Sequence, residues 1–274
     1  MRRKLSRAVF YGLVGLVLLI TLFPIYWMIT TSLKPPGEYV SRHPTLIPLR
    51  PTLEHYRELW AHGFLLHWRN TTVVALSATL ISLVAGFLAA YALVRFRFPA
   101  KFDQLFLLWV LLIKMIPPIV VAIPLYRTLR SVGLLNTLPG LTIVYQVYTL
   151  PYCIWMLLGF VRDVPVELEE AAAIDGASPW RTLRTVVLPL LAPGLVATAI
   201  FSVIMAWNEF IYALLFLHTP ELFTLPIHIA NYITEYETLW GELMGIGFLA
   251  SLPILLLSGY VQRYLLRGFA MGLK

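Results

Sequence analysis

The sequence predicts an all-α membrane protein with six transmembrane helices and both termini in the cytoplasm. Three observations lead to this fold class: the composition, the lengths of the apolar segments and the distribution of basic residues. Hydrophobic residues make up 59% of the 274 residues and charged residues 13%, whereas soluble domains carry about 25% charged residues. The mean hydropathy is +0.78. Because one water-soluble core cannot bury this much apolar surface, we expect a polytopic membrane protein.

Six apolar segments are long enough to cross about 30 Å of hydrocarbon. They lie near residues 8–30, 70–94, 104–126, 140–161, 190–217 and 243–263. The first segment resembles a signal peptide, but it is too long for a signal h-region and no small-x-small cleavage site follows it. We therefore expect a retained first span. The predicted parts are residues 1–69 (first helix and a long outer loop), 70–263 (spans two to six) and the tail 264–274.

The basic residues predict the orientation of these spans. An even number of spans places both termini on the same side. With both termini inside, 13 of the 21 Lys and Arg residues lie in inner segments and 7 in outer loops, and Lys114 falls within a span. Because Lys and Arg concentrate in cytoplasmic loops, both ends are predicted to be cytoplasmic. The same bias accounts for the net charge of +7 without a nucleic-acid partner.

The outer loop of residues 31–69 is rich in proline, so we expect irregular structure with a short helix around Leu53–Trp60. Span three then carries Lys114 near its middle, where a lysine costs roughly 2.5–3.5 kcal/mol and should face protein or a water-filled cavity. Snorkelling, or a span boundary that lies elsewhere, is the alternative. Pro117, Pro118 and Pro124 must break or kink the helix. Together these features predict that span three lines a pathway.

Residues 162–189 form a polar insert between spans four and five. Asp163 is predicted to cap a short helix with Pro165 in its first turn. Alanines 171–173 favour the helix, and Gly176 is predicted to end it in the left-handed conformation. Ser178-Pro179 would begin a second helix, which is amphipathic. An alanine-faced helix fits a groove in a partner, whereas the alternative is a loop lying on the membrane surface.

In span five, Met205, Asn208, Glu209 and Tyr212 are predicted to share one helical stripe. Such side chains suit a sugar, which needs hydroxyl-binding groups and a flat ring to stack on. The alternative is interhelical hydrogen bonding by Asn208 and Glu209. Direct pairing of Glu209 with Lys114 is not expected, because a rise of 1.5 Å per residue places them about 10 Å apart in depth. In span six, Gly241-x-x-x-Gly245 and Gly247-x-x-x-Ser251 fit close helix packing.

The polar insert also carries a family resemblance. Glu170-Ala171-Ala172, Gly176 and Val186-x-Leu188-Pro189 resemble the E-A-A-x3-G-x9-I-x-L-P signature of ATP-binding-cassette (ABC) importer permeases, with valine in place of isoleucine. The segment AWNEFIYAL at 206–214 and the tail QRYLLRGFAMGLK are similar to the carbohydrate-uptake branch. The resemblance is closest to the second, six-span permease of maltose-type transporters and spans nearly the whole chain.

The resemblance implies a type I importer permease fold and assigns roles to residues. The insert would be the coupling helix, which contacts a separate ATPase that binds ATP and Mg. The coupling residues would be Glu170, Ala171, Ala172, Asp175, Gly176, Leu188 and Pro189. Lys114, Asn208, Glu209 and Tyr212 are the candidate substrate-pathway residues. The implied partners are a homologous larger permease, two ATPase subunits and an external substrate-binding protein, which would dock on the acidic outer loop 218–242.

Other function classes fit the sequence less well. Without a G-x-x-x-x-G-K-[ST] motif the chain is not expected to hydrolyse ATP itself. An ion-coupled secondary transporter acting without an ATPase is the main alternative, but it predicts inverted repeats and more buried acids than Glu209 alone. An intramembrane enzyme would need H-E-x-x-H, G-x-S-x-G or paired buried acids, so no catalytic residues are predicted. The single Cys153 and the lack of a Cys/His cluster predict neither a disulfide nor a metal site.

Overall fold

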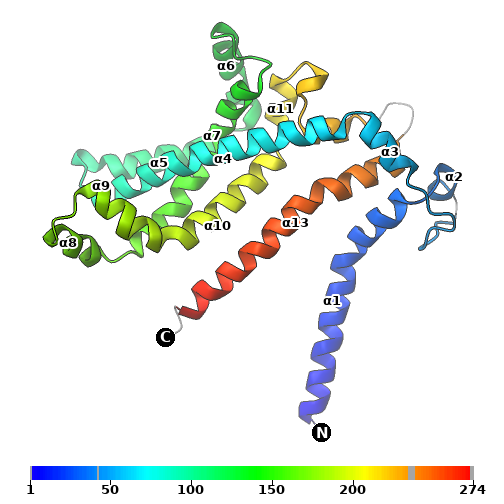
Figure 1. Ribbon diagram of the computed structural model, residues 1–274, viewed down its shortest axis with the longest axis horizontal. Coiled ribbons are helices and arrows are strands. Elements are labelled where there is room, and N and C mark those ends of the chain that lie inside the picture. Colours follow the sequence, from blue (N-terminus) through cyan, green and yellow to red (C-terminus); the bar gives the residue numbers. More distant parts are fainter. Residues whose placement is uncertain (1, 42, 234–237, 272–274) are drawn as a thin grey trace. The chain divides into compact units, whose positions relative to one another are not determined.

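The protein is described by a computed structural model that covers residues 2–41, 43–233 and 238–271. These residues are almost entirely helical (Figure 1), and between them only an isolated bridge joins Ile233 and Thr238. The chain forms two compact units. The first contains Met1–Leu66 and His228–Pro253, and the second contains His67–Ile227 and Ile254–Lys274.

The first unit contains α1 (Arg2–Ser32), α2 (Pro36–Tyr39), α3 (Glu54–Ala61) and the beginning of α13 (Trp240–Met271). The short helix expected around Leu53–Trp60 is confirmed as α3. The apolar side chains of α1 are exposed, Leu19 to 72%. Such a surface suits lipid or a partner helix rather than water, which agrees with the prediction of a membrane span.

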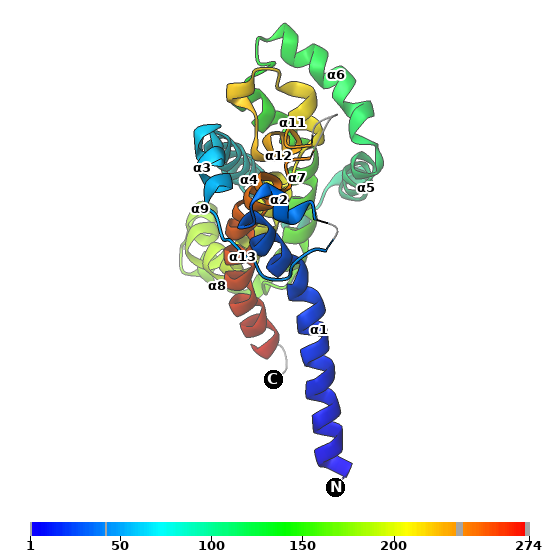
Figure 2. The same cartoon turned by 90° about the vertical axis from the view of Figure 1, so that its right-hand side faces the viewer.

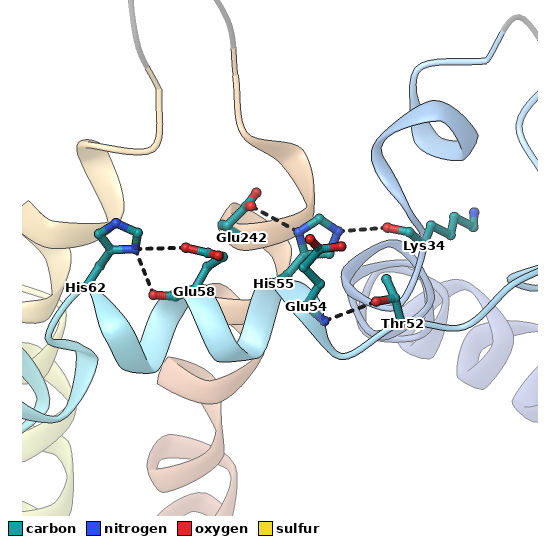
Figure 3. A network of polar contacts seen from close by, with 7 residues as sticks. All are labelled: Lys34, Thr52, Glu54, His55, Glu58, His62 and Glu242. Carbon is teal, nitrogen blue, oxygen red and sulfur yellow. Dashed lines mark hydrogen bonds and ion pairs between the residues drawn. The ribbon is translucent and has the colours of Figure 1, made fainter.

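A buried histidine of α3 contacts α13 and the turn that follows α1 (Figure 3). The His55 ring in α3 is 2% exposed; its Nε2 lies 2.8 Å from the backbone oxygen of Lys34, and its Nδ1 lies 3.0 Å from Oε1 of Glu242. The ring passes over Gly241, where a Cβ would come within 2.3 Å of it. Gly241 and Gly245 therefore serve close packing, as predicted, because their missing side chains leave room for α3.

The second unit is built on α4 (Phe64–Arg95), α7 (Leu138–Arg162) and α10 (Leu188–Trp207). Its apolar core includes Phe87, Leu157 and Leu191. Small polar side chains connect the helices inside the core. The Ser82 and Thr149 hydroxyls are 2.5 Å apart, and Thr79 donates to Ser202 over 3.2 Å. Such hydrogen bonds are a common means of joining helices where water is absent.

Spans three and five are interrupted. The helices α5 (Phe102–Met115) and α6 (Pro118–Ser131) form an angle of 100° at Pro117, and Figure 2 shows α6 turning away from α5. This break was predicted from the prolines. Five helices of the described chain are long and apolar enough to cross a membrane, and there are six if the bent pair counts as one span.

The expected continuous span at 190–217 is wrong in its bounds. The helix begins earlier, at α9 (Pro179–Thr182), passes through a π-helical turn (Leu183–Val187) into α10, and ends at Trp207. A separate helix, α11 (Ile211–Phe216), follows after a break. The short helices Pro99–Lys101, Pro220–Leu222 and α12 (Leu225–Ala230) complete the described elements. In the predicted tail, the backbone is helical to Met271, and residues 272–274 lie outside the described part.

Candidate coupling and pathway sites

The polar insert has the predicted helix, glycine turn and second helix. The first helix is α8 (Val166–Ile174), and Gly176 follows it with φ +80°. The Ala177 N–H donates to the Ala172 carbonyl over 2.9 Å, which closes the end of the helix. Ser178 then caps α9, with Pro179 in the first turn, as predicted. The left-handed glycine therefore sets the angle between the two helices.

Asp163 does not cap α8, contrary to the prediction. It ends α7 instead, and its N–H donates to the Gly159 carbonyl. The residue before α8 is Pro165, with an extended backbone and no capping side chain. The physical reason is that a proline disfavours helical conformation in the residue before it, so α8 begins only after Pro165. Val164, which precedes it, is buried in the core.

Much of the surface of α8 and α9 is exposed. Four of the predicted coupling residues, Glu170, Ala171, Asp175 and Gly176, are exposed, and Ala172 is partly exposed. The other two lie further along the chain, in the first turn of α10: Leu188 packs against the core, and Pro189 is exposed.

Two large apolar side chains near these residues were not predicted to form part of the coupling surface. Ile174 is 87% exposed and Trp180 is 68% exposed. They stand on either side of the Gly176 turn, within an otherwise polar loop. Exposed apolar groups of this size in a polar loop mark an interaction surface. The signal was available in the sequence, because both interrupt a run of polar and small residues.

A mostly buried ion pair attaches α8 to the end of α4, and it was not predicted. Arg95 Nε donates to Glu169 Oε1 over 2.6 Å, and the Tyr91 hydroxyl donates to Oε2 over 2.6 Å. A second guanidinium nitrogen of Arg95 donates to the Val164 carbonyl over 2.8 Å. The side chains of Arg95 and Glu169 are only 13% and 11% exposed. Glu167 and Glu170 lie on the same helix, and the sequence alone does not distinguish them from Glu169.

The predicted stripe of Met205, Asn208, Glu209 and Tyr212 is wrong, because α10 ends at Trp207. The Glu209 carboxylate accepts the N–H groups of Tyr212 over 2.8 Å and Ala213 over 3.1 Å. It therefore caps the beginning of α11, where four N–H groups have no partner within the helix. Asn208 is exposed, and its amide donates to the Ile204 carbonyl.

Tyr212 and Lys114 have aromatic neighbours on α7. The Tyr212 ring is 4% exposed and stacks on Tyr148, with ring centres 6.2 Å apart and planes 3° apart. Lys114 is exposed at the end of α5, and its Nζ lies 5.7 Å from the centre of the Tyr152 ring. Of the four predicted pathway residues, Lys114 and Asn208 are therefore exposed. The other two, Glu209 and Tyr212, hold α11 in place.

Apolar helices long enough to span a membrane, joined by a polar helix–glycine–helix loop with exposed apolar groups, are the features expected of a membrane permease subunit with a contact surface for a partner. The chain belongs to the family of binding-protein-dependent transport system inner membrane components, whose model matches residues 82–270.

Several relatives and solved structures match nearly the whole chain, among them the following three. The diacetylchitobiose uptake system permease protein DasC of Streptomyces coelicolor is 37% identical over 274 residues, which are 99% of each chain. The trehalose transport system permease protein SugB of Mycobacterium tuberculosis is 35% identical, over 97% of each. A chain of a bacterial ABC transporter involved in alginate import has a TM-score of 0.80 at 20% identity, covering 96% of this chain and 98% of that one. The last similarity confirms the importer permease fold.

Proposed function

We propose that this chain forms half of the translocation pathway of an importer for a sugar or sugar derivative, and that a separate ATPase drives it through α8. The observation that carries the proposal is the exposed surface around Gly176. It combines small residues, acids and two exposed apolar side chains on α8 and α9, and a mostly buried ion pair holds α8 to α4.

The substrate class is proposed from the relatives. DasC is named for diacetylchitobiose uptake and SugB for trehalose transport. A permease of Thermococcus litoralis named for trehalose and maltose transport is 33% identical over 94% of this chain. A solved alginate transporter complex with a pentasaccharide-bound periplasmic protein supports a binding-protein partner. A related methionine transporter structure, MetNI, covers 77% of this chain, with a TM-score of 0.60.

The proposed assembly contains a homologous larger permease, two ATPase subunits that bind ATP and Mg, and an external binding protein. We place both termini and α8 in the cytoplasm, in accordance with the bias of basic residues. The outer loop 218–242 is proposed to contact the binding protein. Exposed Lys114 and Asn208 are the proposed pathway-lining residues, whereas Glu209 and Tyr212 shape the pathway by holding α11.

Reconstitution tests this proposal. Proteoliposomes should contain the chain together with the larger permease and the ATPase of the proposed assembly. They should accumulate radiolabelled diacetylchitobiose, trehalose or maltose only when ATP and loaded binding protein are present. Uptake by the permeases alone under a proton or sodium gradient would instead support an ion-coupled secondary transporter. Uptake of none of the three sugars, together with uptake of a non-sugar substrate, would refute the substrate class but not the mechanism.

A further inference from the structure

We propose that Arg95 and Tyr91 are positioning residues that bind Glu169 and so make the end of α4 move with α8. This inference rests on the proposed function of α8 as the contact with the ATPase. It adds a second route from that contact into the membrane helices. The first route is covalent, because the Gly176 turn leads through α9 and the π-helical turn directly into α10.

The geometry of the contact is that of a rigid joint. Both oxygens of the Glu169 carboxylate accept hydrogen bonds, one from Arg95 and one from Tyr91, each over 2.6 Å. Tyr91 and Arg95 are four residues apart on α4, so they lie on the same face of that helix. Two donors from one face fix both the position and the rotation of the carboxylate. A single exposed pair would leave the two helices free to turn.

Arg95 also holds the segment that leads into α8. One nitrogen of its guanidinium group binds Glu169 and another binds the backbone oxygen of Val164, which lies two residues before the helix. Val164 itself is 6% exposed and belongs to the apolar core. The planar guanidinium group can make both bonds at once, which a lysine ammonium on a flexible stem would not do in a fixed geometry. Arg95 therefore binds both the segment that leads into α8 and α8 itself.

Burial makes this pair different from an ordinary surface salt bridge. Exposed pairs contribute little, because water and salt screen them. Here both side chains are mostly buried, at 13% and 11% exposure. Removing one partner leaves the other charge uncompensated in a mostly buried position. A force applied to the exposed side of α8 is thus transmitted to α4 through a contact that is costly to break.

The contact predicts what happens when it is lost. The ATPase would still bind the exposed residues around Gly176, since none of them contributes to the Arg95 contact. Movement of the ATPase would still be transmitted through α9 to α10, but α4 would no longer move together with α8. ATP hydrolysis would then continue while fewer substrate molecules cross per ATP. This is a loss of coupling rather than of assembly.

The test compares Arg95→Gln, Glu169→Gln and the double variant in proteoliposomes that contain the complete complex. Glu167→Gln is the matched control, because Glu167 lies exposed on the same helix. We expect each single variant to retain the co-purified ATPase and to transport about tenfold less sugar per ATP, within the usual range of coupling free energies. The double variant should be no worse than either single one, because residues that act through one contact are not additive.

A variant that keeps both charges distinguishes loss of coupling from misfolding. Tyr91→Phe keeps the ring and the ion pair but removes one hydrogen bond to Glu169, so transport per ATP should fall by about threefold to fivefold. Wild-type coupling in all of these variants would overturn the inference, and so would loss of the ATPase from the complex or an additive double variant.

A further variant separates this failure from failure of the proposed function. Ala172→Trp should block the ATPase contact itself. If Ala172→Trp abolishes transport while the Arg95 variants stay normal, only the joint is refuted. If Ala172→Trp is also silent, then α8 is not the ATPase contact, and the proposed function fails with it.

Discussion

Glu209 has two competing roles that can be tested: substrate contact, as the sequence predicts, or capping of α11, as the structure indicates. Its carboxylate accepts the N–H groups of Tyr212 and Ala213 at 2.8 and 3.1 Å, so it caps α11. Replacing Glu209 with Ala removes both acceptors. Loss of a helix cap costs about 0.5–2 kcal/mol, and each N–H left buried without a partner costs about 1–3 kcal/mol. We therefore expect Glu209→Ala to destabilise the protein by about 2 kcal/mol.

Glu209→Gln should have an intermediate effect. The amide keeps one oxygen for the Tyr212 N–H but turns an NH₂ group toward the Ala213 N–H, so one of two hydrogen bonds is lost. We expect about 1 kcal/mol, which corresponds to about 2–4 °C in the unfolding midpoint for a chain of this size. Asn208→Ala is a comparison for thermal unfolding only, because its amide donates to the Ile204 carbonyl at the end of α10 and does not bind the N–H groups of α11.

The assay measures thermal unfolding in detergent together with uptake at several sugar concentrations. If Glu209 is a cap, Glu209→Ala should be less stable than Glu209→Gln, and both should be less stable than wild type. The transport rate should fall, but the sugar concentration that gives half-maximal uptake should not change. The cap assignment is refuted if Glu209→Gln keeps wild-type stability while the apparent affinity for sugar falls, since that pattern indicates direct contact with the substrate.

Three further predictions follow from the structure. Gly241→Ala should destabilise the first unit by about 1–3 kcal/mol through overpacking, because the added Cβ would lie 2.3 Å from the His55 ring. Thermal unfolding measures this loss. Gly12→Ala is the control, because, beyond its own helical turn, no atom of the described chain lies within 4 Å of the Cβ it would add. Asn136→Ala should release the segment after α6, because its side-chain oxygen accepts the His218 N–H over 2.8 Å; faster proteolysis at that segment would show it, and unchanged cleavage would contradict it. Reporter fusions at positions 98 and 175 should be cytoplasmic and one at 230 external; an external signal at 175 would refute the proposed topology.

The helical segments could be predicted because their signals are local. Apolar runs longer than a bilayer, prolines at 117 and 118, and the pair Ser178-Pro179 each dictate a conformation with little help from the rest of the chain. Gly176 is the same kind of signal, and its φ of +80° confirms it. These features follow from backbone chemistry and hydropathy alone.

The errors concern competition between local signals. Asp163 is a suitable helix cap by residue type. However, α8 begins only after Pro165, so Asp163 lies at the end of α7 instead. Asn208 and Glu209 fit a helical stripe by spacing, yet Glu209 binds backbone N–H groups and so begins a new helix. Polar side chains next to free N–H groups compete with helix continuation, and the periodicity of apolar residues does not reveal this.

The choice of Glu169 over its neighbours depends on tertiary structure. Three acids occur within four residues of α8, and a sequence pattern cannot tell which of them faces α4. The side chains of Arg95 and Tyr91, more than seventy positions earlier, decide it.

The most direct test of the central claim is transport measured together with ATP hydrolysis in proteoliposomes for wild type, Gly176→Val and Ala172→Trp. Gly176 has a φ of +80°, which a β-branched residue strongly disfavours, so valine should change the angle between α8 and α9 without affecting a span. The account predicts normal membrane insertion of both variants, loss of uptake, and ATP hydrolysis no longer stimulated by loaded binding protein. Wild-type uptake by both variants would show that α8 does not couple the permease to an ATPase.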